Sequence, residues 1–577
     1  MIHPLVLLCC RGLVVLLLLL ALMAPVLVQW PAVWQWDYLY WKLLPAAAFY
    51  LFLCSLFSKI RWGLILLLPF LLLVPQEVFY LYTYQKSTDA HALAIVAETD
   101  LAEAAWYLTG IGLLLAALVV GLIALWGYTL RFAWLQKWQW GPGWRPCLWL
   151  VFAGLAASTS WHEWQYQQLN KAAERKNPQE TVFASRPLPY SYEKFHATYP
   201  LNLLVALNEF RVQREATAQV ASQMEHFRFG AKQQPELFGR QIYVLVVGET
   251  LRPDRLQLNG YARSTTPRLA GTDNLISYPD MISPWAWTRM SVPVILSRKA
   301  GTDQRYFPAE ASLVTAFKEA GFSTYWLSTQ SPLGVHDSSI ALHASEADQV
   351  QYLNPVGYRQ EGFYDEILLP AVERVLAQDE QKQLIVLHTL GSHFSYADRY
   401  PKQFDLFTPS GKGQSISMHD SSARQLLNNA YDNSVAYTDF VLFNLINQLK
   451  QTEASSALLF VSDHGENIFD GQCGKSGHGH NTEFDYRVAA LLWFSEALKA
   501  QQPQKTQLAQ SRRQQPLMTT QVFDTLLDLA NLSYPEQQLQ QSWVNPLWQP
   551  GPRVLQQGIN FDTAKRDPVC KELSAVF

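Results

Sequence analysis

The sequence has no block of basic residues. Its 45 Lys and Arg nearly balance 48 Asp and Glu, which leaves a net charge of −3. A chain without a basic run lacks the electrostatic footprint of nucleic-acid binding, so no nucleic-acid partner is expected. Long apolar runs are also missing after residue 162 and gather before it. The 577 residues therefore divide into a membrane-like part and a soluble part, each with its own core.

A signal-peptide cleavage site is likewise missing after the first apolar run, residues 5–28. This run has the length of roughly 20 residues that crosses a bilayer core, and a second run follows it at once. We therefore interpret it as a retained span. The predicted spans number five, with the others at 43–57, 62–74 (extending toward Tyr82), 106–130 and the short run 147–159.

Lys and Arg gather in two of the predicted loops, 58–61 and 131–145, whereas the 84–105 loop is mostly acidic. Because basic loops stay in the cytoplasm, the N-terminus is predicted inside and the chain after the fifth span outside. The organisation predicted is a membrane domain at 1–161, a connector at 162–238 and a catalytic domain at 239–577. A helix in the connector either rests on the membrane surface or packs on the soluble domain.

Cysteine is scarce, with six in the chain, and four of these lie in or beside the predicted spans. Only Cys473 and Cys570 remain in the exported part. These two can pair, but the sequence alone does not decide whether they do.

From Gln241 onward, short apolar strands rich in β-branched residues alternate with helical stretches. Apolar strands without polar alternation are typical of a parallel sheet buried on both faces, which predicts a doubly wound α/β domain. In such domains the ligand site lies beyond the carboxyl ends of the strands. The predicted strands are 241–248, 322–329, 383–389, 456–463 and 488–495.

Three of these strands end in residues suited to metal binding. A set of carboxylates and imidazoles favours zinc, and manganese less well. The alternative is a purely structural polar cluster, since a strand-end Asp often caps a helix. The candidates are Glu249 and Thr250 after the first strand, His388 and His393 after another, and Asp463, His464 and Glu466 after a third.

A metal held this way lowers the pKa of a bound hydroxyl and so makes a nucleophile near neutral pH. Thr250 follows a strand directly, whereas Thr288 and Ser291 lie where a loop enters a helix, a place that favours phosphate. The residues alone leave the choice of hydroxyl open. Two further histidines, His478 and His480, lie in a glycine-rich stretch behind the Asp-His pair and can act at the site or face solvent.

Several stretches, taken together in this order, resemble the phosphoethanolamine transferases of Gram-negative inner membranes, a family within the alkaline phosphatase and sulfatase superfamily. The resemblance implies an alkaline phosphatase-like soluble domain behind five membrane helices. The stretches are VVGETLRPDRLQLNGYARSTTPRL (246–269), WTRMSVPVILS (287–297), HTLGSH (388–393), YDNSVAYTD (431–439) and SDHGEN (462–467).

The resemblance also implies roles for individual residues. Thr288 matches the nucleophile of the family, and Glu249, Asp463 and His464 match its zinc ligands, with Thr288 completing the shell. His393 matches a histidine that contacts the transferred phosphate group. A further histidine of the family lies over the site, and His480 matches it slightly better than His478.

The sequence departs from the family pattern beside the nucleophile. Pro284 and Val294 stand where well-studied members have a cysteine pair, so rigidity there must come from packing. Arg289 replaces a small residue and adds a cation that can face phosphate. In the stretch ETDLAEAA (98–105), Thr99 and Glu103 resemble residues that hold the lipid donor, although Ile95 replaces an expected asparagine.

The reaction implied is transfer of phosphoethanolamine from phosphatidylethanolamine to lipopolysaccharide or a periplasmic glucan, by a monomer anchored in the bacterial inner membrane with its catalytic domain in the periplasm. Two alternatives share these features. One is a phosphoglycerol transferase or sulfatase-like hydrolase, and the other is a membrane sensor with a decayed site.

Overall fold

The computed structural model describes residues 4–28, 42–84, 87–90, 92–93, 96, 108, 111–176, 198–234, 237–305, 310–330, 339–354, 364–414 and 416–575. Apart from a short stretch at 99–110, the chain divides into an N-terminal unit that ends at Val212 and a C-terminal unit that begins at Gln213. The division falls within helix α11 (Leu201–His226), inside the predicted connector. The predicted domain boundaries at 161 and 238 stay predictions.

The N-terminal unit is helical. Two helical segments of its described residues, Ile60–Tyr82 and Gly112–Leu135, are long and apolar enough to cross a membrane. The apolar helices Leu13–Val28 and Leu44–Ser55 are shorter, so the count of five spans stays a prediction. The helices are α1 (Pro4–Val28), α3 (Leu44–Ser55), α4 (Ile60–Leu66), α5 (Leu68–Tyr84), α8 (Gly112–Leu135) and α9 (Trp144–Lys176).

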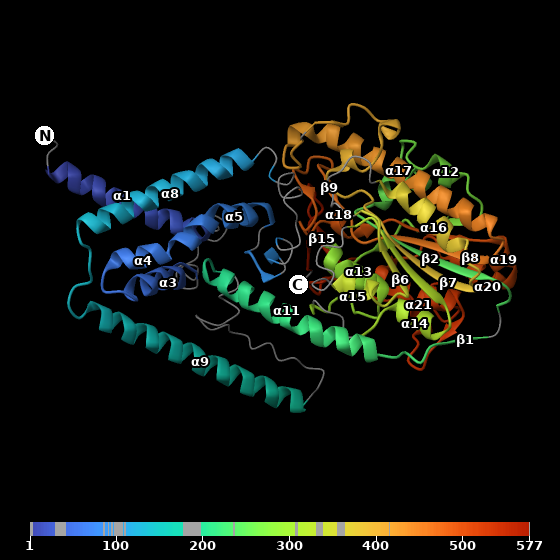
Figure 1. Cartoon of the computed structure of the whole chain (residues 1–577), viewed down its shortest axis with the longest axis horizontal. Coiled ribbons are helices and arrows are strands. Elements are labelled where there is room, and N and C mark those ends of the chain that lie inside the picture. The colour runs from blue at the N-terminus through green and yellow to red at the C-terminus, as the bar shows by residue number, and fades with distance from the viewer. Residues whose placement is uncertain are drawn as a thin grey trace. The chain divides into compact units, whose positions relative to one another are not determined.

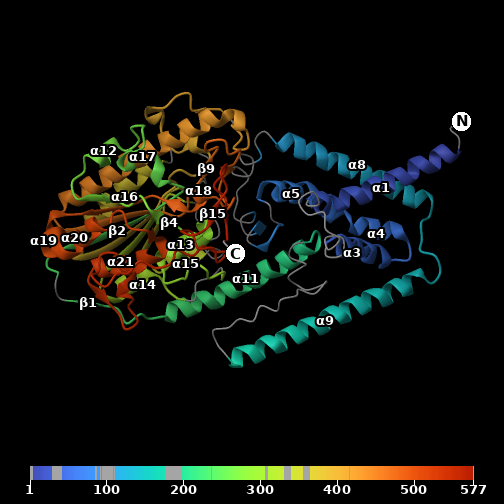
Figure 2. The same cartoon turned by 180° about the vertical axis from the view of Figure 1, so that it is seen from behind.

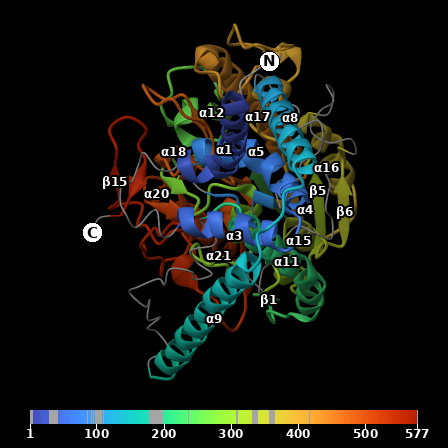
Figure 3. The same ribbon diagram turned by 90° about the vertical axis from the view of Figure 1, so that its left-hand side faces the viewer.

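Helices α1, α5 and α8 pack against one another within this unit (Figure 3). Leu22 of α1 and Leu71 of α5 are fully buried in the shared core. Helix α4 approaches α3 closely, since a Cβ added to Gly63 would lie 2.4 Å from Cys54 Cα. The unit therefore has a core of its own, as the composition predicts.

A seven-stranded sheet forms the centre of the C-terminal unit, in the order β3-β12-β8-β2-β7-β5-β6. The strands from β8 to β6 run parallel, which confirms the mostly parallel sheet. Strand β12 runs antiparallel to both of its neighbours, so the parallel prediction is wrong for 488–495. The bounds are β2 (Gln241–Gly248), β3 (Leu275–Ser277), β5 (Ser323–Ser328), β6 (Gln349–Tyr352), β7 (Lys382–His388), β8 (Ser455–Ser462) and β12 (Ala490–Phe494).

Helices cover both faces of this sheet (Figures 1 and 2). Tyr243, Leu245 and Val247 of β2 join the core under α14 (Leu313–Glu319) and α21 (Val522–Leu529). The alternate β2 residues, from Ile242 to Val246, join the core under α16 (Leu368–Leu376) and α17 (Arg424–Gln451). Because both faces are filled, the carboxyl edge of the strands is the place left for a site.

The register of the central strands determines which side chains meet at that edge. Gly248 of β2 pairs with Ser462 of β8. The residues that follow these strands, Glu249 and Asp463, therefore leave the sheet side by side. Helix α13 (Thr288–Leu296) begins at the predicted nucleophile.

We predict that Gly248→Ala destabilises the C-terminal unit. A Cβ at this position would lie 2.4 Å from Cζ of Phe460, and overpacking of this kind costs about 1–3 kcal/mol. Thermal unfolding should show a lower Tm, and the second substitution Phe460→Leu should recover part of the loss. Gly271→Ala is the matched control, because its nearest neighbour would be 3.8 Å away. Equal Tm values for Gly248→Ala and Gly271→Ala would contradict this packing.

The five-span prediction has its own test. A reporter that works only outside the cytoplasm should be active when fused beyond Cys570, and a cytoplasmic reporter should be active when fused near Trp138. This expectation follows from the basic loop at 131–145, because basic loops stay in the cytoplasm. The opposite pattern of activity would overturn the span count.

Candidate metal and nucleophile site

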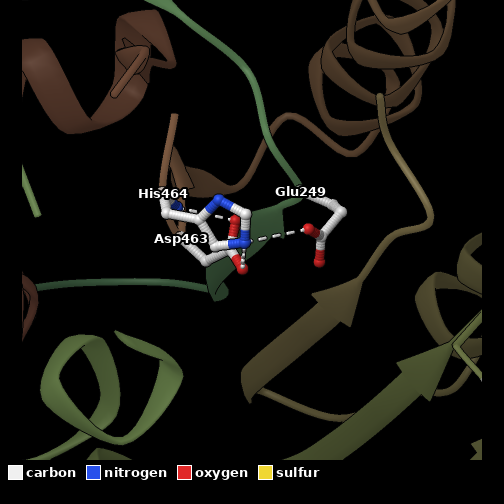
Figure 4. Close-up of side chains that lie close together, drawn as sticks. All are labelled: Glu249, Asp463 and His464. Carbon is white, nitrogen blue, oxygen red and sulfur yellow. Dashed lines mark hydrogen bonds and ion pairs between the residues drawn. The ribbon is translucent and has the colours of Figure 1, made fainter. Parts of the chain in front are cut away.

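Three side chains from two neighbouring strand ends converge at the carboxyl edge of the sheet. The ligand atoms of Glu249, Asp463 and His464 all lie within 4.8 Å of one another, and all three residues are buried. His464 Nε2 lies 3.3 Å from Glu249 Oε1 and 3.4 Å from Asp463 Oδ2 (Figure 4). Three of the strand-end residues that the sequence singles out are thus brought together.

The hydroxyl of Thr288 lies at the same cluster. Its Oγ1 is 3.2 Å from Glu249 Oε2 and 3.2 Å from His464 Nε2. Thr288 is the first residue of α13, and Trp287 precedes it in an extended conformation without a side-chain cap. The unpaired N–H groups of a helix start suit a phosphate. The geometry thus places a hydroxyl beside both metal-ligand candidates and an anion-binding helix end.

Thr250, which carries the other candidate hydroxyl, already forms hydrogen bonds to both carboxylates of the cluster. It donates to Glu249 Oε1 over 2.6 Å, and its backbone N–H donates to Asp463 Oδ1 over 3.0 Å. Its φ of +61° is in the left-handed region that β-branched residues rarely adopt, and the Tyr431 hydroxyl donates to its carbonyl oxygen over 2.7 Å. This strained turn orients both carboxylates, which favours Thr288 as the nucleophile.

The cluster has the properties of a cation site. Asp463 Oδ2 is buried and accepts no hydrogen bond from the described residues. Burial and the charge of Glu249 raise the pKa of Asp463 to about 7. Burial alone would lower the pKa of His464, but Asp463 and Glu249 raise it to about 10. The carboxylates therefore attract positive charge, and their combination with an imidazole fits zinc.

The two histidines of the 388–393 stretch lie in different surroundings. His388 ends β7 and packs against Trp326, with ring centroids 6.0 Å apart, and burial lowers its pKa to about 4. It does not join the metal group. His393 Nδ1 lies 2.6 Å from the Phe394 carbonyl oxygen and donates to it, so Nε2 carries the lone pair of a neutral imidazole. Burial also lowers the pKa of His393.

Of the two histidines in the glycine-rich stretch, the structure brings His478 to the cluster. Its ring centroid is 4.2 Å from that of His464 and 5.1 Å from that of Trp287, and its Nδ1 is 3.3 Å from Glu466 Oε2. His480 Nε2 instead donates to the carbonyl oxygen of Ser476 over 2.9 Å. The slight preference of the sequence for His480 does not match this arrangement.

The residues predicted to bind substrate are only partly described. Arg289 is buried in the first turn of α13, and the Ser339 hydroxyl donates to its carbonyl oxygen. Thr99 and Glu103 lie outside the described residues. Val294, which replaces one cysteine of the family pair, is buried in a cluster with Trp285 and Met290. Apolar packing therefore stabilises α13 where the disulfide is missing.

Sequence reasoning missed Gln330 and Asp365. Gln330 Nε2 donates to Glu249 Oε2 over 3.3 Å, and it follows β5, so the strand-end rule would have found it. Asp365 accepts the backbone N–H groups of Leu390 and Gly391 over 2.9 and 2.8 Å. Gly391 has a φ of +50° and lies so close to Glu249 that a Cβ would be 2.8 Å from its carbonyl oxygen. No sequence signal identifies Asp365.

The segment after Asp463 is fixed by an ion pair and a disulfide. The buried guanidinium of Arg252 donates to the Glu466 carbonyl oxygen and to Asp470. Cys473 and Cys570 form a disulfide across 97 residues of sequence. The strands β9 (Asn467–Ile468) and β10 (Ser476–Gly477) pair on either side of Cys473. The loop that carries His478 is therefore held at its base.

A family model described as Sulfatase matches residues 241–532, which is half of the chain. The chain belongs to the sulfatase family. The matched range begins at β2 and contains every residue of the cluster described above.

Curated relatives of this sulfatase-family chain include phosphoethanolamine transferase EptC of Escherichia coli O18:K1:H7, 29% identical over 311 residues. That match covers 52% of the chain and 53% of the relative, about half the length of each. Kdo(2)-lipid A phosphoethanolamine 7''-transferase of Escherichia coli K12 is 25% identical over 87% of the chain and 90% of its own length. These relatives confirm the resemblance to phosphoethanolamine transferases.

Two solved structures show the same fold. The periplasmic domain of EptC from Escherichia coli in complex with Zn has a TM-score of 0.53 at 26% identity, covering 59% of this chain and 97% of that one. The integral membrane protein lipooligosaccharide phosphoethanolamine transferase A from Neisseria meningitidis has a TM-score of 0.61 at 22% identity, covering 85% and 88%. The second match extends the shared fold to the N-terminal helical unit.

We predict that Asp463→Asn and His464→Ala lose metal. Removal of a residue that is hydrogen-bonded to a metal ligand lowers metal affinity by roughly 10- to 100-fold. Each of these two substitutions removes a ligand atom itself, so the zinc affinity should fall further than that. Gln330→Ala is the graded control, since it removes only a donor to Glu249 and should lose about 10- to 100-fold. Zinc content after dialysis against chelators of increasing strength measures the series. Equal retention in all three variants would show that the metal lies elsewhere.

Proposed function

We propose that this protein transfers phosphoethanolamine from phosphatidylethanolamine to lipopolysaccharide through a phospho-threonine intermediate on Thr288. The observation that carries the proposal is the position of the Thr288 hydroxyl, 3.2 Å from both Glu249 Oε2 and His464 Nε2. The names of the relatives support the group transferred. An acceptor at lipid A or the inner core is favoured over a periplasmic glucan, because one relative is named for lipid A.

In the first half-reaction, Thr288 Oγ1 forms a bond to phosphorus while the bond from phosphorus to the diacylglycerol oxygen breaks. Glu249 Oε2 already accepts the hydrogen bond of this hydroxyl and is placed to take its proton. Burial raises the pKa of Glu466 to about 7, so its protonated carboxyl can donate to Nδ1 of a neutral His478 and leave the ring proton on Nε2. Through this Nε2–H, His478 binds the incoming phosphate or supplies a proton to the departing oxygen.

In the second half-reaction, a hydroxyl or phosphate oxygen of the acceptor attacks phosphorus while the bond from phosphorus to Thr288 Oγ1 breaks. Glu249 returns its proton to Thr288 Oγ1, and His478 regains a proton from the attacking hydroxyl or from solvent. His393 contacts the phosphate group in both steps, since a neutral Nε2 lone pair allows it to accept or hold a proton. Arg289 adds positive charge at the start of α13. Two displacements of this kind return the enzyme to its initial state.

Glu249, Asp463, His464 and Thr288 would hold a zinc ion, in preference to manganese. When bound, zinc lowers the pKa of a hydroxyl and polarises a phosphoryl oxygen. The zinc complex of the EptC domain supports this choice of metal.

The Cys473–Cys570 disulfide supports a catalytic unit outside the cytoplasm, because such bonds persist in oxidising compartments. We place the protein in a bacterial inner membrane as a monomer, with this unit in the periplasm. The N-terminal helices give access to the lipid donor, and Thr99 and Glu103 are proposed to help hold it.

The nucleophile is tested by intact-mass measurement of the zinc-loaded protein with phosphatidylethanolamine and no acceptor. The wild-type protein should gain one phosphoethanolamine on the peptide that contains Thr288. Thr288→Ala should gain none, and Thr288→Ser should gain it partly, because the hydroxyl stays while the methyl group that restricts its rotamer is lost.

Thr250→Ala is the control for this experiment. Its hydroxyl orients Glu249, so the variant should still be labelled, although more slowly. A label on Thr250, or full labelling of Thr288→Ala, would refute the assignment. Release of glycerol phosphate or sulfate from the corresponding donors would favour the alternative activities of the superfamily.

A further inference from the structure

Trp287 directly precedes the proposed nucleophile in the chain, and its indole contacts His478. Trp287 forms the cap of α13, which begins at Thr288. Its ring lies 5.1 Å from the imidazole of His478, centroid to centroid, in an edge-on arrangement at 81°. One residue therefore joins the start of the nucleophile helix to a histidine nearly 200 positions later in the chain.

The backbone beside His478 also packs on this indole. A Cβ added to Gly479 would lie 2.2 Å from Trp287 Cζ2 and 2.5 Å from Cη2. Gly479 has a φ of +83°, which other residues rarely adopt. The loop can approach Trp287 this closely only because position 479 is a glycine.

Two other groups complete the surroundings of the His478 imidazole. His464 lies on one side at 4.2 Å between ring centroids, and Glu466 Oε2 meets Nδ1 at 3.3 Å. Glu466 fixes which ring nitrogen is paired, but a single hydrogen bond leaves the ring able to pivot. Of these three neighbours, Trp287 is the one that directly precedes the helix that carries the nucleophile.

We infer that Trp287 is a positioning residue. Its indole holds the His478 imidazole against His464 and so fixes the position of this imidazole relative to the Thr288 hydroxyl. This inference rests on the proposed transfer reaction and on the role of His478 in it. Loss of the indole removes the packing partner of the imidazole and of Gly479, while Glu249, Asp463 and His464 keep their contacts with one another. The rate of phosphoryl transfer should therefore fall without loss of metal.

Trp285 supplies a matched control. It is a buried tryptophan two residues away, and it packs in a cluster with Met290 and Val294. Trp285→Ala removes the same volume from the same segment as Trp287→Ala. A general loosening of α13 should lower the transfer rate in both variants, whereas a role through His478 predicts that only Trp287→Ala changes the exposure of His478 and that only its rate loss disappears in a His478→Ala background.

The first measurement is transfer by the zinc-loaded full-length protein, with kcat and KM determined separately. Trp287→Ala should lower kcat by about 10- to 100-fold, the range for residues that orient a functional group, with zinc content and KM near wild type. Trp287→Phe retains an aromatic edge and should recover most of the rate. In a His478→Ala background, Trp287→Ala should add no further loss, because the two residues act as one unit.

The second measurement needs no activity. The rate at which diethylpyrocarbonate modifies His478, followed by mass spectrometry of its peptide, should rise in Trp287→Ala and stay unchanged in Trp285→Ala. Additive rate losses, or equal modification rates in both variants, would overturn the inference. If the wild-type protein shows no transfer but the modification rates change as stated, the proposed function fails while the positioning of His478 by Trp287 stands.

Discussion

Two buried carboxylates held side by side are the constraint on which the site depends. Glu249 and Asp463 leave the sheet together because Gly248 of β2 pairs with Ser462 of β8. Like charges this close and this buried cannot both stay ionised without a positive partner. His464, the turn at Thr250 and the amide of Gln330 all direct donors at them. The parallel sheet thus brings two buried carboxylates together at one point of its edge, where a bound cation would stabilise their negative charge.

In the proposed reaction, the same pair of carboxylates also explains why the nucleophile would lie at the start of α13. A hydroxyl that is to be activated must share the environment of the carboxylates, yet it must also face an open phosphate site. Thr250 meets the first condition only, since its strained turn directs the hydroxyl into Glu249. Thr288 meets both, because a helix start supplies N–H groups on its other side. In the proposed reaction, Thr250 therefore orients a carboxylate while Thr288 attacks phosphorus.

The sequence predicts those parts of the fold and the site that follow from strand ends. The mostly parallel sheet is confirmed, and Glu249, Asp463 and His464 meet where the rule places them. The direction of β12 was not predictable, because a strand buried on both faces has the same apolar pattern in either direction. The sequence separates His478 and His480 only slightly, whereas the structure gives His478 the contacts with His464, Glu466 and Trp287 and pairs His480 with the Ser476 carbonyl oxygen. The Cys473–Cys570 disulfide joins residues 97 positions apart, and no local sequence pattern indicates that the two cysteines pair.

Rigidity at this site does not come from the cysteine pair that well-studied members of the resembled family have beside the nucleophile, because Pro284 and Val294 stand at those positions. Beside Thr288, the helix is held by packing of Val294 on Trp285 and Met290. The covalent link lies instead at the base of the loop that carries His478, at Cys473. A bridge on the loop and apolar packing on the helix each fix one side, so their relative position depends on the contact between them. Trp287 on Gly479 and His478 is that contact, so in the proposed reaction a tryptophan next to Thr288 would affect proton transfer by His478.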